Sequence, residues 1–214
     1  MATRYSFDTE SDFHTFFEDF DKYTAGDWTL TTTEAGAGDA TEAIGNIDGG
    51  VLVITNDAAD NDLDFFQLTK ETFKFVVGKK MFFKCRFKIL EVIECDMRLG
   101  LMITDTTQLD VTDGIYFGTD DGDALLDFSV EKNNTATLVA GVATLVADTF
   151  VTVGFYYDGE SSDIDYFVNG DTVGSVALTN MVDDEELAVS FGLQNGQAVA
   201  NVMTIDFIVV KKER

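Results

Sequence analysis

The stretch Phe150–Gly174 constrains the fold more than any other part of the chain. It reads FVTVGFYYDGESSDIDYFVNGDTVG, with two turn dipeptides, Asp158-Gly159 and Asn169-Gly170. Alternate residues from Val151 to Tyr157 are apolar and fall on one side of a strand, while each dipeptide supplies the positive φ of a tight turn. Moving either turn by one residue would turn the apolar side outward. The stretch predicts an antiparallel meander of two strands and the start of a third.

Similar short apolar runs follow one another along the chain, about a dozen in all, with turn signals every 8 to 12 residues or so. The last one, Val202–Val210, is apolar on both sides and is therefore expected to be a central strand. This spacing is typical of an all-β sandwich of two antiparallel sheets. At 214 residues the chain fits one domain, because sandwiches commonly exceed 200 residues. We expect a single domain over residues 1–214, with residues 1–48 as an N-terminal extension or loop region.

Three segments invite specific expectations. Phe13, Phe16, Phe17 and Phe20 have helical spacing, which favours a short amphipathic helix or turn before Trp28. Residues 31–48 are rich in Thr, Ala and Gly and are interpreted as a surface loop or irregular edge. Residues 136–146 are interpreted as a hairpin centred on Gly141, with a helix as the alternative.

The runs Met81–Leu90 and Cys95–Ile103 alternate strictly, so we expect a hairpin that turns near Leu90. Symmetric pairing would place Cys85 and Cys95 nearly opposite on the buried face, within reach of a disulfide. We expect free thiols, because cytoplasmic synthesis keeps cysteines reduced and buried cysteine behaves as a small hydrophobe. Two cysteines are also too few for a zinc site.

The acid excess restricts the partners of this chain. Thirty-nine Asp and Glu face 14 Lys and Arg, a formal charge of -25, which disfavours nucleic acid and anionic membranes. No secretory signal and no run of about eighteen apolar residues is recognisable, so we expect no membrane span and synthesis in a cytoplasm.

Basic residues are unevenly distributed. Lys84, Arg86, Lys88 and Arg98 belong to one basic segment, whereas Lys132 is the only base between Leu99 and Val210. This layout favours a basic stripe on an acidic body and oriented docking. The alternative is that these bases balance nearby acids.

Paired carboxylates are the candidate catalytic groups of this chain. Glu94 and Asp96 share one face of a strand, as acid and nucleophile do in sugar hydrolysis, but Arg98 occupies the next position where a third acid would be needed. Glu91 falls on the opposite face or in the turn. His14 is the only histidine, which leaves no Ser/His/Asp set. We expect no catalytic residues and interpret this segment as a solvated hairpin tip.

Two acidic loops could hold calcium. Asp60–Asp64 and Asp120–Asp123 each cluster the hard oxygen ligands that calcium takes. Neither has the spacing of an EF-hand loop. We expect no cofactor, with calcium in these loops as the alternative.

Several pieces in order along most of the chain resemble the concanavalin A-like group, the jelly-roll sandwiches that include laminin-G-type and legume-lectin-type domains. The matching segments are Gly49–Ile54, Gly78-Lys79 before a long strand, Phe155–Asp158, Phe167–Gly170, Phe191–Leu193 and Ile205–Val209. The resemblance implies a concanavalin A-like jelly-roll β-sandwich. The lectin metal ligands and the acid triplet of glucanases have no counterparts here.

The acidic single-domain form also resembles capsid-associated structural proteins of tailed bacteriophages. That resemblance implies a non-enzymatic virion protein, made in the host cytoplasm, that decorates or cements the capsid surface. Its partner would be the major capsid protein, and it would form a homo-oligomer, a dimer or trimer. The candidate contact residues are Phe13, Phe16, Phe17, Phe20, Trp28, Lys84, Arg86, Lys88 and Arg98. The alternative function is a carbohydrate-binding, lectin-like module of a phage tail or cell surface.

Overall fold

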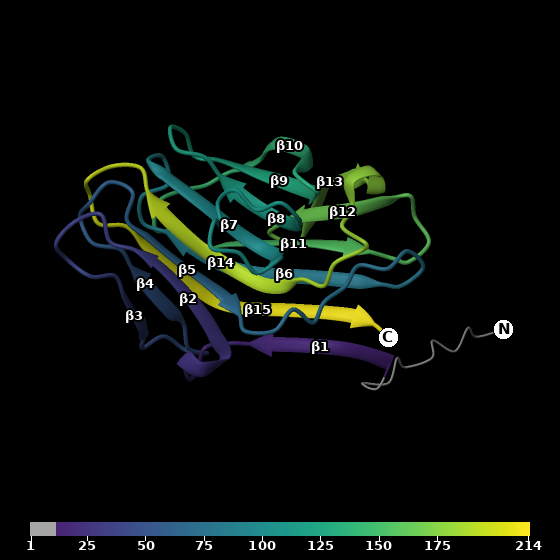
Figure 1. Ribbon diagram of the computed structural model, residues 1–214, viewed down its shortest axis with the longest axis horizontal. Coiled ribbons are helices and arrows are strands. Elements are labelled where there is room, and N and C mark those ends of the chain that lie inside the picture. Colours follow the sequence, from purple (N-terminus) through teal and green to yellow (C-terminus); the bar gives the residue numbers. More distant parts are fainter. Residues whose placement is uncertain (1–11) are drawn as a thin grey trace.

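The computed structural model describes residues 12–214, so the first eleven residues of the expected N-terminal extension lie outside the described part. Two antiparallel sheets pack face to face as a jelly-roll β-sandwich (Figure 1), which confirms the predicted fold class. One sheet has the order β13-β12-β11-β6-β15-β4-β3, with β1 also paired to β15. The other has the order β10-β9-β8-β7-β14-β5-β2.

The strands of the eight-stranded sheet are β1 (Phe13–Glu18), β3 (Thr41–Ile44), β4 (Leu52–Thr55), β6 (Met81–Ile89), β11 (Val151–Tyr157), β12 (Asp163–Val168), β13 (Asp171–Ala177) and β15 (Val202–Glu213). Those of the seven-stranded sheet are β2 (Trp28–Thr33), β5 (Leu63–Leu68), β7 (Cys95–Met102), β8 (Gly114–Thr119), β9 (Leu125–Lys132), β10 (Thr135–Thr144) and β14 (Ala188–Asn195). The described residues also form the short 3-10 turns η2 (Ala25–Asp27) and η3 (Leu178–Asn180). In residues 12–214 no helix has the length and apolar character needed to cross a membrane.

The meander expected from Phe150–Gly174 is present as β11, β12 and β13. Gly159 and the Asn169-Gly170 pair adopt positive φ at the two reversals, with values of 88°, 52° and 92°. Val153, Phe155 and Tyr157 are buried, so the alternation points the apolar side inward as predicted. The last strand, β15, is central as predicted, because it pairs with β6 on one side and with β4 and β1 on the other.

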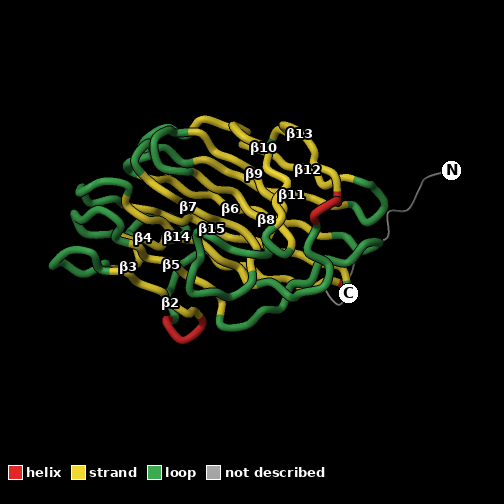
Figure 2. Tube along the Cα trace, turned by 45° about the horizontal axis from the view of Figure 1, so that its top comes forward, coloured by secondary structure: helices red, strands yellow, loops and turns green. Residues whose placement is uncertain are grey.

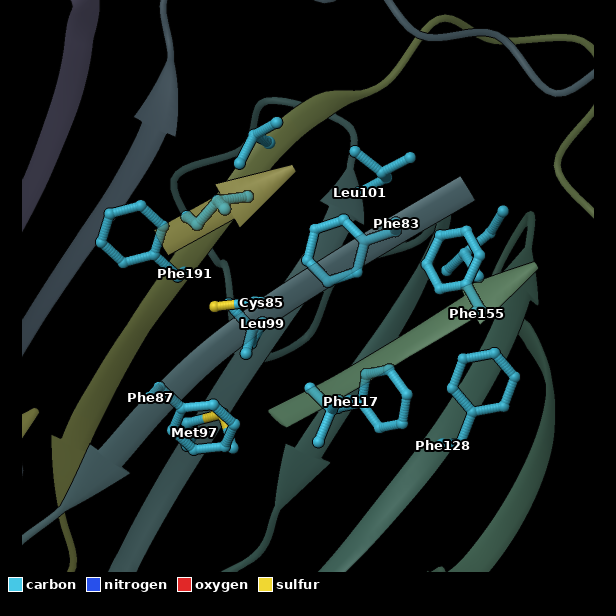
Figure 3. Close-up of a cluster of buried hydrophobic side chains, with 14 of the residues drawn as sticks. Phe83, Cys85, Phe87, Met97, Leu99, Leu101, Phe117, Phe128, Phe155 and Phe191 are labelled. Atoms are coloured by element: carbon cyan, nitrogen blue, oxygen red, sulfur yellow. The ribbon is translucent and has the colours of Figure 1, made fainter. Parts of the chain in front are cut away.

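The core lies between the sheets and is built largely from phenylalanine. Figure 3 shows rings and aliphatic side chains from both sheets gathered there, among them Phe83 and Phe87 of β6, Phe155 of β11, and Phe117 and Phe128 of β8 and β9. All five are fully buried. Each such ring stabilises the fold by roughly 1.5–3 kcal/mol relative to an exposed ring. Packing therefore determines the residues at inward positions. The outward residues between them are the ones available to contact a ligand.

The expected hairpin between Met81–Leu90 and Cys95–Ile103 is wrong. β6 pairs with β11 and β15, whereas β7 pairs with β8 and β14 in the opposite sheet. The chain crosses between the layers after Leu90, which adjacency in sequence does not reveal. Cys85 and Cys95 therefore project into the same core from facing sheets, buried and free. Burial raises the pKa of Cys95 to about 12, so this thiol stays protonated.

The expected helix near Phe13 and the expected hairpin near Gly141 are also wrong. Phe13–Glu18 form strand β1, paired along its length with β15, because its alternate residues can face the core. Residues 135–144 form one strand, β10, whose register with β9 shifts between Val139 and Ala143 around Gly141. The segment expected to be a loop, residues 31–48, contains the end of β2 and all of β3.

Three loops gather at one end of the sandwich, on the left in Figures 1 and 2. They follow β2, β4 and β14, and hydrogen bonds join them: the Asn195 side chain donates to the backbone oxygens of Asp57 and Ala59, at 2.7 and 3.0 Å. This end lies opposite the C-terminus in Figure 1.

Candidate functional site

The sandwich has two outer faces with different chemistry. The outer face of the seven-stranded sheet, called the polar face, carries hydrogen-bonding side chains. The outer face of the eight-stranded sheet carries aromatic and basic side chains. Strand alternation explains both, since the residues between buried positions must point away from the core.

The polar face contains a cavity of about 170 Å³, called the polar pocket. Its lining residues are Arg98, Tyr116, Gly118, Asp120, Asp127, Ser129, Ala136 and Leu138. Register brings them together, because Arg98 of β7 lies opposite Gly118 of β8, which lies opposite Asp127 of β9. Tyr116 and Ser129 form the next row of the same sheet. Three neighbouring strands thus deliver the polar groups to one place.

Arg98 is held firmly in the polar pocket. Its guanidinium donates to the backbone oxygens of Met97 and Thr119, at 3.0 and 2.8 Å, and forms a salt bridge with Asp120 at 2.9 Å. The guanidinium also lies 5.8 Å from the ring centre of Tyr116. Its Nε is buried and has no hydrogen-bond partner among residues 12–214. The side chain is only 15% exposed, so Arg98 is a pre-oriented donor rather than a loose surface cation.

Tyr116 and Asp127 complete the pocket. Tyr116 donates its hydroxyl hydrogen to Glu131 at 2.7 Å, and burial, aided by this bond, raises the pKa of Tyr116 to about 12. Tyr116 is therefore a neutral donor whose ring supports the pocket. One Asp127 carboxylate oxygen accepts the Gly141 N–H at 2.7 Å. The second oxygen of Asp127 remains for an incoming donor.

A loop, residues 103–113, lies on the polar face beside the pocket. Val111 and Leu109 pack on the outward side chains of Leu63, Phe65 and Met102. Gln67 fixes the start of the loop, because it donates to the Ile103 oxygen and accepts the Asp105 N–H. Between this loop and β2 runs a groove of about 520 Å³, called the threonine groove, lined by Thr29, Thr31, Gln67, Thr69, Thr104, Asp105 and Thr106.

Carboxylates gather at the end of the polar face where β7 begins. Contact with the Asp121 carboxyl, more than burial, raises the pKa of Glu94. Asp96 accepts the Asp121 N–H at 2.9 Å. Asp121 comes from the β8–β9 turn, so this turn places a further carboxyl beside Glu94, whereas the third outward position of the strand itself is Arg98. Sequence reasoning missed the Asp121 carboxyl because Glu94 and Asp121 belong to different turns.

The eight-stranded sheet carries a wider groove of about 770 Å³, called the aromatic groove. Its lining residues are Thr15, Phe17, Asp19, Gly49, Phe82, Lys84, Asp206, Phe207, Val209 and Lys211. Phe17 is 59% exposed, and the Lys84 ammonium lies 5.5 Å from the ring centre of Phe207. In the described part of the chain, neither Lys84 nor Lys211 forms a salt bridge. The groove therefore offers rings and free ammonium groups on an acidic protein.

The nine candidate contact residues are divided between these places. Phe17, Lys84, Arg86 and Lys88 lie on the outer face of the eight-stranded sheet, with Phe13 at its edge. Arg86 pairs with Asp206, Lys88 pairs with Asp148, and both lie over the ring of Phe150. Phe20 and Trp28 are buried in the core, and Phe16 packs against it. Arg98 lies on the polar face.

The chain matches no protein-family model and no curated protein. Solved structures match nearly all of it. An endo-1,3-beta-glucanase from Streptomyces sioyaensis has a TM-score of 0.67 at 15% identity, covering 98% of this chain and 99% of its own. An endo-beta-1,4-glucuronan lyase from Trichoderma reesei has a TM-score of 0.59 at 12% identity, covering 91% and 94%. The carbohydrate recognition domain of Emp46p has a TM-score of 0.57 at 10% identity, covering 86% and 88%.

At such low identity these structures establish the fold alone. The chain has the concanavalin A-like jelly-roll fold that its sequence resembles. The comparisons contradict the expectation that the protein is not an enzyme, because glucanases, a glycosidic hydrolase and a lyase share this fold. That expectation considered carboxylates along one strand and overlooked carboxylates from other turns, such as Asp121 beside Glu94.

Proposed function

We propose that the protein binds an extended glycan chain on the polar face. The observation that carries the proposal is the polar pocket, where Arg98, Tyr116 and Asp127 converge from the three adjacent strands β7, β8 and β9 beside the threonine groove. Support comes also from the fold, which is shared with proteins named for action on, or recognition of, carbohydrate. Fold likeness by itself does not assign a function.

The pocket matches the chemistry of a sugar. Sugar hydroxyls both donate and accept hydrogen bonds, and the pocket presents guanidinium donors beside a carboxylate acceptor and a hydroxyl. Arg98 is oriented before any ligand arrives, so little side-chain entropy is lost on binding. Leu138, 57% exposed at the rim, offers an apolar surface for the C–H side of a sugar ring.

Isothermal titration calorimetry with β-1,3-glucan and β-1,4-glucuronan oligosaccharides tests this proposal. We expect one of the two probes to bind the full chain, and Asp127→Asn to weaken that binding about tenfold, a loss of about 1.4 kcal/mol. The matched control is Asp165→Asn, an exposed carboxylate on the outer side of β12 in the other sheet. Absence of heat with both probes, or equal loss in both variants, would refute the proposal.

The same samples show whether the bound chain is cut. Glu94 is the candidate acid on the polar face, because contact with the Asp121 carboxyl raises the pKa of Glu94 and a raised pKa suits a general acid. Release of reducing ends that is lost in Glu94→Gln, with binding retained, assigns cleavage to Glu94. Binding without release assigns recognition alone.

The aromatic groove favours a second candidate, the capsid decoration suggested by sequence resemblance. Exposed Phe17 suits a protein partner better than a hydroxyl-rich one, because aromatic side chains are enriched at protein interfaces. The capsid partner, the oligomer and the virion location remain predictions.

Co-sedimentation with tailed-phage shells at low and high salt tests the second candidate. Phe17→Ser should release the protein from the shell, whereas Leu138→Ser should not, since Leu138 is equally exposed at 57% on the other face. A protein that ignores shells, or equal effects of both variants, would remove this candidate.

A further inference from the structure

We propose that Glu34, Asp57 and Asp62 bind one calcium ion at the end of the sandwich where the loops after β2, β4 and β14 meet. These are the three residues whose ligand atoms all lie within 4.8 Å of one another. Two oxygens bound to one calcium at 2.3–2.6 Å are separated by at most roughly 4.6–5.2 Å. All three carboxylates can therefore reach a single ion. Figures 1 and 2 show the loops that carry them at the left of the molecule.

The cluster contains buried oxygens without donors, which distinguishes it from an ordinary acidic surface. Asp62 is fully buried, and while one of its carboxylate oxygens accepts the Ala35 N–H at 2.6 Å, the other has no partner among residues 12–214. The unpartnered oxygen of Asp57 is buried in the same way. An unpaired buried acceptor costs about 1–3 kcal/mol, more when charged, so two such oxygens in one cluster call for a cation.

Two amides add further unpartnered oxygens beside the carboxylates. Asn56 is fully buried and donates its side-chain N–H to the Asp62 backbone oxygen at 2.8 Å, but within the described part of the chain its Oδ1 has no donor. Asn195 donates to the Asp57 backbone oxygen, and its Oδ1 also lacks a donor. Every unsatisfied atom here is an acceptor, which is the pattern expected around a positive ion.

The loop after β2 orients the carboxylates. The Gly38 N–H donates to Asp57 at 2.8 Å, as the Ala35 N–H does to Asp62. Each carboxylate thus uses one oxygen for the loop and presents the other, the arrangement of outer hydrogen bonds that supports metal ligands. A Cβ on Gly38 would lie 2.1 Å from the Asp57 carboxylate oxygen, so only glycine allows this approach.

The ligand chemistry selects a hard divalent cation. The cluster offers only oxygen atoms, with no histidine or cysteine, which suits calcium rather than zinc or copper. The ligand oxygens of Asp57 and Asp62 also lie within 4.8 Å of each other. Two carboxylates in contact repel each other unless a proton or a cation lies between them.

The proposed site overlaps one of the two acidic loops that were the alternative to the expectation of no cofactor. Asp60–Asp64 contributes Asp62, but the other ligands are Asp57 and Glu34, which stand outside that loop. Asp64 instead accepts the Thr32 hydroxyl hydrogen at 3.0 Å. In Asp120–Asp123, Asp120 is paired with Arg98, and Asp123 accepts the Leu125 N–H.

Calcium titration of the EDTA-treated full chain tests the site without any glycan, so its outcome is separate from that of the glycan proposal. We expect heat for one site per chain. We also expect the melting temperature to rise by roughly 5–10 °C at a calcium concentration about 100 times the Kd.

Two variants show whether the proposed ligands bind the calcium ion. Glu34→Gln should lower calcium affinity at least about tenfold while leaving the melting temperature in EDTA unchanged, because Glu34 is exposed and glutamine can still accept the Ala40 N–H. The matched control Asp60→Asn removes a charge from an exposed position of the same loop and should bind like the parent. Lack of heat and of any melting shift at 10 mM calcium would mean that water alone occupies these oxygens. That result, or equal affinity in Glu34→Gln and the parent, would overturn the proposal.

Discussion

The two outer faces of this sandwich rest on the same core but present opposite chemistries. On the polar face the outward residues Arg98, Tyr116 and Asp127 are hydrogen-bonded and enclosed. On the other face the aromatic groove is lined by exposed Phe17 and by half-buried Lys84, whose ammonium lies over the Phe207 ring. Packing dictates only the inward positions, so the outward sets were free to differ. Their difference shows which face is pre-organised to hold a ligand.

Two arginines, one on each outer face, differ in how firmly they are held. Arg98 and Arg86 each point outward from the middle of a strand, each pairs with one aspartate, and each lies near an aromatic ring. Arg98 is 15% exposed and also bonded to two backbone oxygens, whereas Arg86 is 40% exposed. Only the first is held in one geometry by its surroundings.

The largest expected effect concerns the tyrosines of the two faces. Tyr116→Ala should lower the free energy of unfolding by about 3 kcal/mol, because the ring is 8% exposed and packs under the loop of residues 103–113. Tyr156→Ala on the other face should cost less than about 1 kcal/mol, since Tyr156 is 38% exposed. Urea unfolding of both variants measures this. Equal losses of unfolding free energy in the two variants would show that Tyr116 contributes no more to stability than the exposed Tyr156.

The next effect concerns ligand affinity. Arg98→Lys should weaken glycan binding at least about tenfold, because lysine cannot reproduce the fixed fork of donors that the backbone oxygens and Asp120 orient. Arg86→Lys should leave the affinity unchanged within about twofold. Titration calorimetry of both variants with the bound oligosaccharide measures this. A loss in Arg86→Lys and none in Arg98→Lys would move the binding site to the aromatic groove.

The smallest effect concerns the acid sensitivity of strand β1, which contributes Thr15 and Phe17 to the aromatic groove. His14 on β1 stacks on Phe73 at 4.5 Å, and burial, followed by the charges of Arg214 and Lys212, lowers the pKa of His14 below 6.5. The unfolded chain then binds a proton more readily than the folded one. The contribution of neutral His14 to the free energy of unfolding is fully present above pH 6.5. It is lost as the pH falls through the lowered pKa of His14.

The matched variant His14→Gln cannot titrate, so it isolates this contribution. The parent should lose more stability than His14→Gln when urea unfolding is compared at pH 7.5 and 5.5. Identical pH dependence of the two proteins would show that the stacked histidine does not couple β1 to pH.

Local patterns predicted the parts of the fold that depend on local geometry. The alternation from Val151 to Tyr157 and the turn at Asn169-Gly170 gave the meander, because strand period and turn conformation are properties of neighbouring residues. Pairing between distant strands was not predictable in the same way. β6 and β7 follow each other yet lie in opposite sheets, since alternation says which side is buried and not which strand lies alongside.

In the candidate sites, too, single residues were predictable from the sequence, whereas their partners from distant parts of the chain were not. Arg98 was identified from its position in a basic segment, but its pocket partners Asp127 and Ser129 come from a strand about thirty residues away. The acidic loop at Asp62 was recognised, whereas Glu34 became a ligand candidate only when the fold brought the β2–β3 loop against it. Tertiary register, which no short motif encodes, assembled both sites.

Hydrogen–deuterium exchange of the full chain, with and without the bound oligosaccharide, tests most directly where the ligand lies. Binding on the polar face predicts slower exchange in β7, β8, β9 and the loop of residues 103–113, with β1, β6 and β15 unchanged. Slower exchange confined to β1, β6 and β15 would contradict the account and assign the ligand to the aromatic groove.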